Sequence, residues 1–171
     1  MSSYVFRPAK ADEVPAVYEL IMARVYWMDE VGIRQWNVTD YAGCYPPAHY
    51  EAARLRGDLF VLTDDEGIAA CAVLRKDDER WPAAMQSAEH AFYLHHLATR
   101  LGAKGAGRIF LQMAEEYAIR EGKTRFRLDS ADDNAFLADY YTAQGYVPAG
   151  RCVDGLYTGI LREKVLQGGT P

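Results

Sequence analysis

The chain contains no apolar run of the length that a membrane-spanning helix requires. Such a helix needs about 20 consecutive apolar residues, and no segment of the 171-residue sequence approaches that length. The first ten residues, MSSYVFRPAK, also lack the apolar stretch of a secretory signal peptide. We therefore expect a cytoplasmic protein with no membrane partner.

Cysteine and basic charge are both scarce. The three cysteines, Cys44, Cys71 and Cys152, form neither a CxxC pair nor a metal-ligand spacing, so we expect no metal. Cys71 lies within the apolar run IAACAVL, and we expect it to be buried and unreactive. With 19 Lys and Arg against 24 Asp and Glu, the net charge of −5 argues against a nucleic-acid partner.

Repeats, linkers and low-complexity segments are absent as well, and half of the residues are hydrophobic. A chain of this length and composition suits one domain, which we expect to span residues 1–171. Apolar periodicity and turn residues predict the order strand, helix, helix, strand hairpin, strand, helix, strand, helix, strand hairpin. That order is typical of an α/β protein with a mixed sheet.

The limits of these elements follow from the change of apolar period and from glycine and proline. The predicted helices cover 12–32, 50–55, 107–121 and 134–143. The predicted strands cover 5–9, 58–65, 68–78, 91–99, 125–130, 146–153 and 156–163, with Asp154-Gly155 as the turn of the last hairpin.

Three glycines separate the predicted strand AFYLHHLAT from the helix that begins at Gly107. Glycine lets a ligand approach the backbone, and the first N–H groups of a helix lack internal partners at its positive end. The step therefore predicts an anion site, although glycines used for turn geometry alone are an alternative. Gly105-Ala106 follows Lys104, which excludes a Walker A loop, and Phe110 replaces the third glycine of the dinucleotide fingerprint.

The segment from 93 to 146 resembles the GNAT family of N-acetyltransferases. Its step GAKGAG stands where that family has Gln/Arg-x-x-Gly-x-Gly/Ala, and the stretch GIRQW matches more loosely. The family's downstream spacing is met by Asn134, Tyr141, Gly145 and Tyr146. The resemblance implies the GNAT fold, a mixed central sheet flanked by helices. It also implies direct transfer of an acetyl group from acetyl-CoA to a primary amine of a small molecule or peptide.

The resemblance further implies which residues bind acetyl-CoA. Backbone N–H groups of the glycine step would hold its pyrophosphate, with added charge from two basic side chains, and the end of the preceding strand would bind the pantetheine arm. Asn134 matches a family asparagine that contacts the coenzyme, and it suits a helix N-cap equally well. The step departs from the family in its shorter length and in Gly102 at its first position. The implied coenzyme-binding residues are Leu97, Ala98, Thr99, Ala103, Lys104, Gly105, Ala106, Gly107, Arg108 and Asn134.

Acetyl transfer to an amine requires a base for the ammonium and a proton for the departing thiolate. Tyr141 stands where the family has the tyrosine acid beside the sulfur, and Tyr140 is its neighbouring alternative. Histidine titrates near neutral pH, so His95 is the candidate base, with a hydrogen-bonded core histidine as the alternative. Glu30 and Glu89 are other candidates for the base.

Regular strand alternation would place Tyr93, His95, Leu97 and Thr99 on one face of their strand, and Leu94, His96 and Ala98 on the other. His96 is then expected to face a covering helix.

The loop after the first predicted helix is rich in aromatic residues, and the family builds part of its acceptor site there. Aromatic faces and carboxylates suit a cationic amine, whereas a small satellite core under the loop is the alternative. The implied acceptor residues are Trp27, Glu30, Arg34 and Trp36. A homodimer is compatible with the exposed aromatic residues. A coenzyme-binding sensor or assembly module without turnover, and transfer of a longer acyl group, stay open as other hypotheses.

Overall fold

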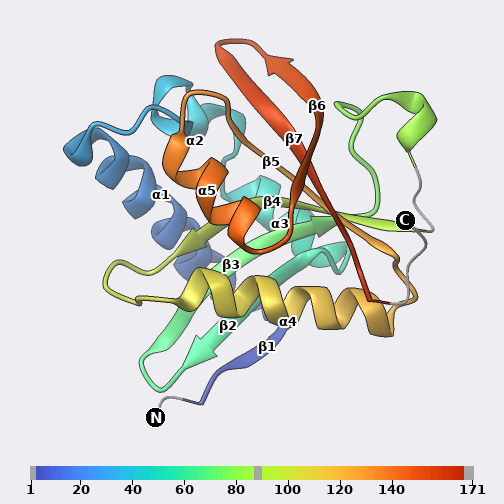
Figure 1. Ribbon diagram of the computed structural model, residues 1–171. Coiled ribbons are helices and arrows are strands. Elements are labelled where there is room, and N and C mark those ends of the chain that lie inside the picture. Colours follow the sequence, from blue (N-terminus) through green and yellow to red (C-terminus); the bar gives the residue numbers. More distant parts are fainter. Residues whose placement is uncertain (1–2, 87–89, 168–171) are drawn as a thin grey trace.

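Seven strands form one mixed sheet in a computed structural model that describes residues 3–86 and 90–167 (Figure 1). The strand order is β1-β2-β3-β4-β5-β7-β6; β4 and β5 are parallel, and the other neighbouring pairs are antiparallel. The strands are β1 (Val5–Pro8), β2 (Leu59–Asp64), β3 (Gly67–Arg75), β4 (Ala91–Thr99), β5 (Arg125–Ala131), β6 (Val147–Asp154) and β7 (Tyr157–Val165). The helices are α1 (Val14–Val31), α2 (Tyr41–Cys44), α3 (Pro47–Leu55), α4 (Ala106–Arg120) and α5 (Ala135–Ala143).

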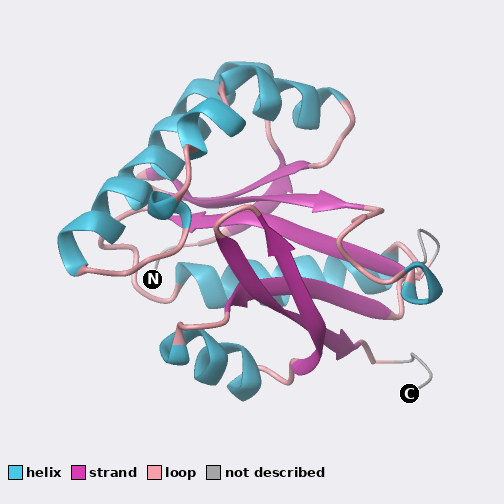
Figure 2. Cartoon of the chain, turned by 90° about the horizontal axis from the view of Figure 1, so that it is seen from above, coloured by secondary structure: helices cyan, strands magenta, loops and turns pink. Residues whose placement is uncertain are grey.

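Helices cover both faces of the sheet (Figure 2). On one face, α1 and α3 pack on β2, β3 and β4, and on the other face α4 and α5 bury a larger apolar cluster. The predicted α/β architecture with a mixed sheet is confirmed. The predicted order of elements is also confirmed, although the sequence did not indicate α2 or the short 3₁₀ turns η1 (Ala11–Glu13), η2 (Trp36–Val38) and η3 (Ala83–Met85).

The two long helices show how apolar spacing determines burial. In α1 the buried residues recur at steps of three and four, and Gly32 ends the helix with a left-handed φ of 75°, as predicted. In α4 the fully buried stripe runs through Phe110, Ala114 and Ala118. Ile109, Met113 and Tyr117 are partly buried and pack against the same apolar cluster.

A β-bulge in β4 determines which way its side chains face. Cys71 pairs with Ala98 and Val73 with His95, so three residue steps along β4 match two along β3. His96 takes a left-handed φ of 57° at this point. The predicted alternation is therefore wrong beyond His95, because the extra residue reverses the facing of the later side chains in the strand. Leu97 packs in the α4 cluster with Leu94, and His96 turns to the α3 face.

The parallel strands β4 and β5 separate after a short paired segment. They pair only through Ala91–Tyr93 and Arg125–Arg127, whereas β5 continues to pair with β7 as far as Ala131. The C-terminal half of β4 therefore presents one unpaired edge toward β5. Unpaired N–H and C=O groups on such an edge can bind a ligand in extended form.

Two predictions from composition can be compared with the structure. Cys71 is buried, and burial raises the pKa of its thiol to about 12, which agrees with the unreactive state expected for it. Among residues 3–86 and 90–167, no helix combines the length and the apolarity needed to cross a membrane.

Candidate active site

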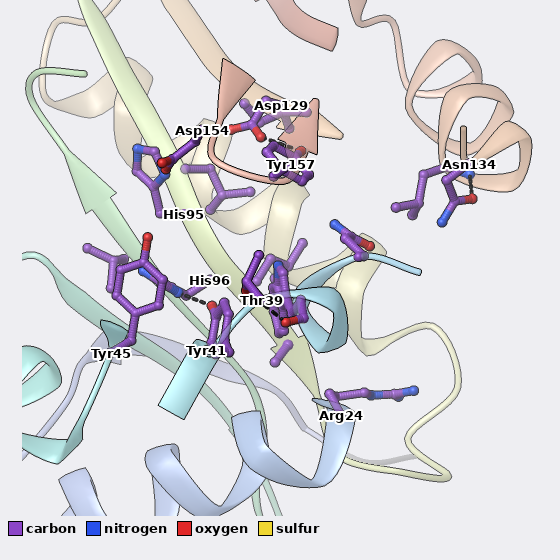
Figure 3. Close-up of a pocket in the computed structure, with 18 of the residues that line it drawn as sticks. Arg24, Thr39, Tyr41, Tyr45, His95, His96, Asp129, Asn134, Asp154 and Tyr157 are labelled. Atoms are coloured by element: carbon purple, nitrogen blue, oxygen red, sulfur yellow. Dashed lines mark hydrogen bonds between the residues drawn. The ribbon is translucent and has the colours of Figure 1, made fainter. Parts of the chain in front are cut away.

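A cavity of about 1390 Å³ opens where β4 and β5 separate (Figure 3). The unpaired half of β4 forms its floor, and α1 with the following aromatic loop forms one wall. The start of α4, α5 and the β6–β7 turn complete the lining. Segments far apart in the sequence thus meet around one strand edge.

The N-terminus of α4 gives the cavity a positive end. Gly105 caps the helix with a left-handed φ of 80° and no side-chain cap. The backbone N–H groups of Gly105, Gly107 and Arg108 have no hydrogen-bond acceptor within the described part of the chain. Free N–H groups at a helix start bind anions such as phosphate. Of the predicted glycine step, Gly107 lines the cavity directly.

Gly107 is also a point of close approach. A Cβ atom added there would lie 3.3 Å from Thr99 Cγ2 and 3.4 Å from Tyr140 Oη, which is a tight contact. Because Gly107 has no side chain, the start of α4 can lie close to the end of β4 and to α5.

The basic side chains around the step have different surroundings. Arg100 forms an ion pair with Asp64 at 2.7 Å and so turns away from the helix start. Lys104 and Arg108 are exposed, and no ion pair involves them in the portion of the chain that is described. They are therefore available to a phosphate group.

Arg24 of α1 ties the first helix to the end of β4. Its Nε donates to the backbone carbonyl of Thr99 at 2.7 Å, and its guanidinium lies 4.8 Å from the ring of Trp27. Burial lowers the pKa of Arg24. Sequence reasoning missed this residue, although its place beside the buried stripe of α1 was a detectable signal.

Asn134 and the two adjacent tyrosines come from α5 and its start. Asn134 accepts the N–H of Leu137 at 3.0 Å and so caps the helix, while it also lines the cavity. Tyr141 is buried, and its burial, together with Tyr140 and Asp129, raises the pKa of its hydroxyl. Tyr140 is half-buried, and burial raises its pKa too. Both rings line the cavity, so position alone does not choose between them.

His95 lies in a polar cluster on the opposite side of the floor. Its Nε2 is 3.2 Å from Asp78 Oδ2, and its Nδ1 is 3.1 Å from Arg80 Nη2. Because an arginine N–H can only donate, Nδ1 is the acceptor and the ring proton is on Nε2. Both nitrogens of His95 are therefore engaged within the protein.

Arg80 is the centre of this cluster. Its Nη2 also lies 2.8 Å from Asp129 Oδ1, while Tyr157 donates to Asp129 Oδ2 at 2.6 Å. Burial disfavours the charge on Asp78, but hydrogen bonds from His95 and Arg80 outweigh it and hold the pKa of that carboxyl low. Sequence reasoning missed the parts played by Asp78 and Arg80. Asp78 lies at the end of the predicted strand 68–78, and Arg80 follows it in a segment for which no helix or strand is predicted.

His96 occupies an aromatic cluster above α3. The buried Tyr41 hydroxyl forms a hydrogen bond with its Nδ1, and the ring of Tyr45 lies 4.5 Å away. Burial, with the positive charge that His95 and His49 would carry, lowers the pKa of His96 far below its usual value, so the ring is neutral.

The predicted acceptor residues divide into two groups. Trp27 and Trp36 line the cavity, and Trp36 stacks on Tyr41 at 4.9 Å, so the aromatic loop is both packed and part of the wall. Glu30 and Arg34 are exposed and lie outside the lining. The candidate base Glu89 lies outside the described residues.

Three acidic or histidine side chains could in principle hold a metal ion. Asp78, His95 and Asp129 bring one ligand atom each to within 4.8 Å of one another. The Nη2 group of Arg80 contacts all three, so a positively charged group already stands among them. The expectation that no metal takes part stays a prediction.

Comparisons with known proteins agree with this geometry. The model of the acetyltransferase (GNAT) family matches residues 30–146. A GNAT-family acetyltransferase structure from Listeria monocytogenes has a TM-score of 0.76 at 21% identity, covering 95% of each chain. No curated protein sequence matches the chain significantly.

Two further solved structures contain a coenzyme. The PaiA N-acetyltransferase of Thermoplasma acidophilum, in complex with coenzyme A, has a TM-score of 0.70 at 17% identity and covers 95% of this chain and 99% of its own. YncA from Salmonella typhimurium, with its cofactor acetyl-CoA, has a TM-score of 0.66 at 18% identity, over 95% and 94% of the two chains. At these identities the likeness shows the fold.

Proposed function

The chain belongs to the acetyltransferase (GNAT) family, and from this premise we propose that it moves an acetyl group from acetyl-CoA directly to a primary amine of a small molecule or peptide. The observation that carries the proposal is the separation of β4 from β5 beside the free N–H groups of α4. An extended pantetheine arm fits an unpaired strand edge, and a pyrophosphate fits a helix start.

The residues present suit acetyl-CoA. Gly105, Gly107 and Arg108 offer unpaired N–H groups, and Lys104 with the Arg108 side chain adds positive charge. Leu97 and Ala98 would hold the arm through their backbone, whereas the Thr99 carbonyl already accepts from Arg24. The Nδ2 group of Asn134 keeps its donors, since its capping bond uses Oδ1. Bound acetyl-CoA supplies the activated thioester.

Tyr141 is our candidate for the residue that protonates the departing thiolate. Its raised pKa keeps the hydroxyl protonated at neutral pH, so it is a donor until the thiolate forms. Tyr140 is the alternative, because its hydroxyl approaches Gly107 at the helix start. If Tyr141 is the acid, Tyr141→Phe loses activity, and if Tyr140 is the acid, Tyr140→Phe loses it.

His95 stays our candidate base for the acceptor's ammonium. Its Nε2–H donates to Asp78, which would stabilise the charged ring once Nδ1 takes a proton. The lone pair of Nδ1 is directed at Arg80, so the base acts only after Arg80 has moved. This engagement of both nitrogens also favours the second candidate function, a coenzyme-binding module without turnover.

Two measurements test the proposed function. Acetyl-CoA is mixed with a panel of primary amines, which includes amino acids, polyamines, aminoglycosides and a peptide with a free N-terminus, and free thiol is measured. Calorimetry with coenzyme A reports binding independently of transfer. Thiol release that depends on an amine supports the enzyme, whereas tight coenzyme binding with no release from any amine supports the non-catalytic module. No binding at all would contradict both.

A further inference from the structure

We propose that Asp78, His95 and Asp129 form the subsite for the acceptor's ammonium group, and that the Arg80 side chain fills this subsite until the acceptor displaces it. The proposal rests on the proposed function, because it assigns the place of the amine within the same cavity. It also explains how a histidine whose two nitrogens are occupied can become a base.

The contacts of one nitrogen atom locate the subsite. Nη2 of Arg80 lies 3.1 Å from Asp78 Oδ2, 3.1 Å from His95 Nδ1 and 2.8 Å from Asp129 Oδ1. These three side chains come from the loop after β3, from β4 and from β5, and all of them line the cavity. The position of Nη2 is thus defined by three acceptors on separate elements.

Arg80 Nη2 carries fewer hydrogens than there are acceptors around it. An arginine Nη2 group carries two hydrogens, so it can serve three acceptors only if one hydrogen is shared between two of them. A primary ammonium group carries three hydrogens in a tetrahedral arrangement and could donate one to each. The subsite therefore suits an ammonium group better than the guanidinium that occupies it.

The negative charge of the subsite also favours an ammonium ligand. Asp78 and Asp129 carry two negative charges against the single positive charge of Arg80, and Asp154 adds a carboxylate from the end of β6 (Figure 3). Neutral groups also face the cluster. They include the hydroxyls of Tyr45, Tyr141 and Tyr157, the thiol of Cys152 and the rings of His49 and His96. When an ammonium group replaces Arg80, one buried cation replaces another and the carboxylates stay compensated.

Arg80 has a route out of the cluster. Its side chain is 22% exposed, and it comes from a loop rather than from a strand or helix. Outside the cavity its charge is hydrated, so displacement exchanges protein partners for water. No rearrangement of the sheet is needed.

Displacement would release the lone pair of His95 Nδ1 for the amine. One N–H bond of the ammonium breaks as an Nδ1–H bond forms, and Asp78 holds the resulting imidazolium at Nε2. The neutral amine then forms the C–N bond as the C–S bond of the thioester breaks. The thiolate takes a proton from the tyrosine acid, which the second amine proton replaces, so atoms and charge balance.

The test uses a small amine without acetyl-CoA. Binding of propylammonium is measured by calorimetry on the wild type, on Arg80→Gln and Arg80→Ala, and on Arg54→Ala as control. Arg54→Ala removes the same charge from an ion pair with Glu51 on α3, outside the cavity lining. Tetramethylammonium, a cation with no N–H group, is the control ligand.

We expect the Arg80 variants to bind propylammonium at least about tenfold more tightly than the wild type. In the wild type only the fraction of molecules whose subsite is free of Arg80 can bind the amine, and the apparent affinity is reduced by that fraction. Arg54→Ala should resemble the wild type, and tetramethylammonium should gain nothing. Equal affinities in the wild type and in the Arg80 variants would overturn the proposal. An equal gain for tetramethylammonium would also overturn it.

A second measurement covers the case in which both Arg80 variants unfold. In the wild type saturated with propylammonium, the ¹⁵N signal of His95 Nδ1 should shift, and Asp129→Asn should weaken that binding. An unchanged His95 signal at saturation would contradict the proposal. Since no acetyl-CoA is present, missing thiol release counts only against the proposed function, and missing amine binding counts only against the subsite.

Discussion

Arg24 Nε donates to the backbone carbonyl of Thr99 at a distance of 2.7 Å, and the same guanidinium bonds to the Thr99 hydroxyl. This pair joins α1 to the last residue of the strand that forms the cavity floor. It therefore couples the acceptor wall to the strand edge on which the coenzyme would lie.

Arg24→Ala should loosen this end of β4. A hydrogen bond to a charged group contributes about 1.5–3 kcal/mol, so we expect a loss of unfolding free energy of about that size together with weaker binding of coenzyme A. Denaturant unfolding and calorimetry measure the two effects. Arg54→Ala is the matched control, and an Arg24 variant with unaltered coenzyme affinity would contradict the coupling.

Gly107→Ala should weaken coenzyme binding without unfolding the protein. The added Cβ would meet Thr99 Cγ2 at 3.3 Å and Tyr140 Oη at 3.4 Å, so the first turn of α4 must shift by a few tenths of an ångström. We expect the dissociation constant for coenzyme A to rise roughly tenfold, equivalent to about 1.4 kcal/mol. Gln112→Ala, on the exposed face of the same helix, should leave the affinity unchanged.

Tyr141→Phe should reduce turnover and leave coenzyme binding largely intact. Loss of a general acid typically costs about 10²–10⁴ in rate, which a thiol-release assay measures, with calorimetry as the binding control. Tyr140→Phe is the matched variant on the same helix. If Tyr140→Phe loses the activity instead, the acid is Tyr140, and if neither variant does, the acid lies elsewhere.

Glu13 should make part of the free energy of unfolding dependent on pH. Hydrogen bonds from Arg7 outweigh the burial of the carboxyl and lower the pKa of Glu13 from 4.5 to about 2. Because the folded pKa is depressed, the stabilisation is present above pH 4.5 and is lost as the pH falls toward 2. The pair is partly solvated, so we expect about 1 kcal/mol. Denaturant unfolding at pH 6 and pH 3 should show a smaller difference for Glu13→Gln than for the wild type.

Local sequence patterns predicted much of the fold. Apolar steps of three and four residues in α1, alternation with turn residues in the hairpins, and glycine after the helix at Gly32 are all short-range signals, and the structure bears them out. The glycine step before α4 is likewise a local signal of a helix start with free N–H groups. Burial of Glu115, which accepts from Tyr146 and pairs with Lys164, had no such signal, since its partners lie far along the chain.

The amino-acid sequence by itself determined the order of the elements and the glycine-rich start of α4, because backbone propensity and apolar period act between neighbouring residues. Only the tertiary structure decided that the adjacent residues His95 and His96 line the same cavity, since the bulge arises from the register of β4 against β3. It also decided that Arg80 stands between Asp78, His95 and Asp129. Charges from three separate elements compensate one another only after the chain has folded, and no spacing in the sequence predicts that these side chains come into contact.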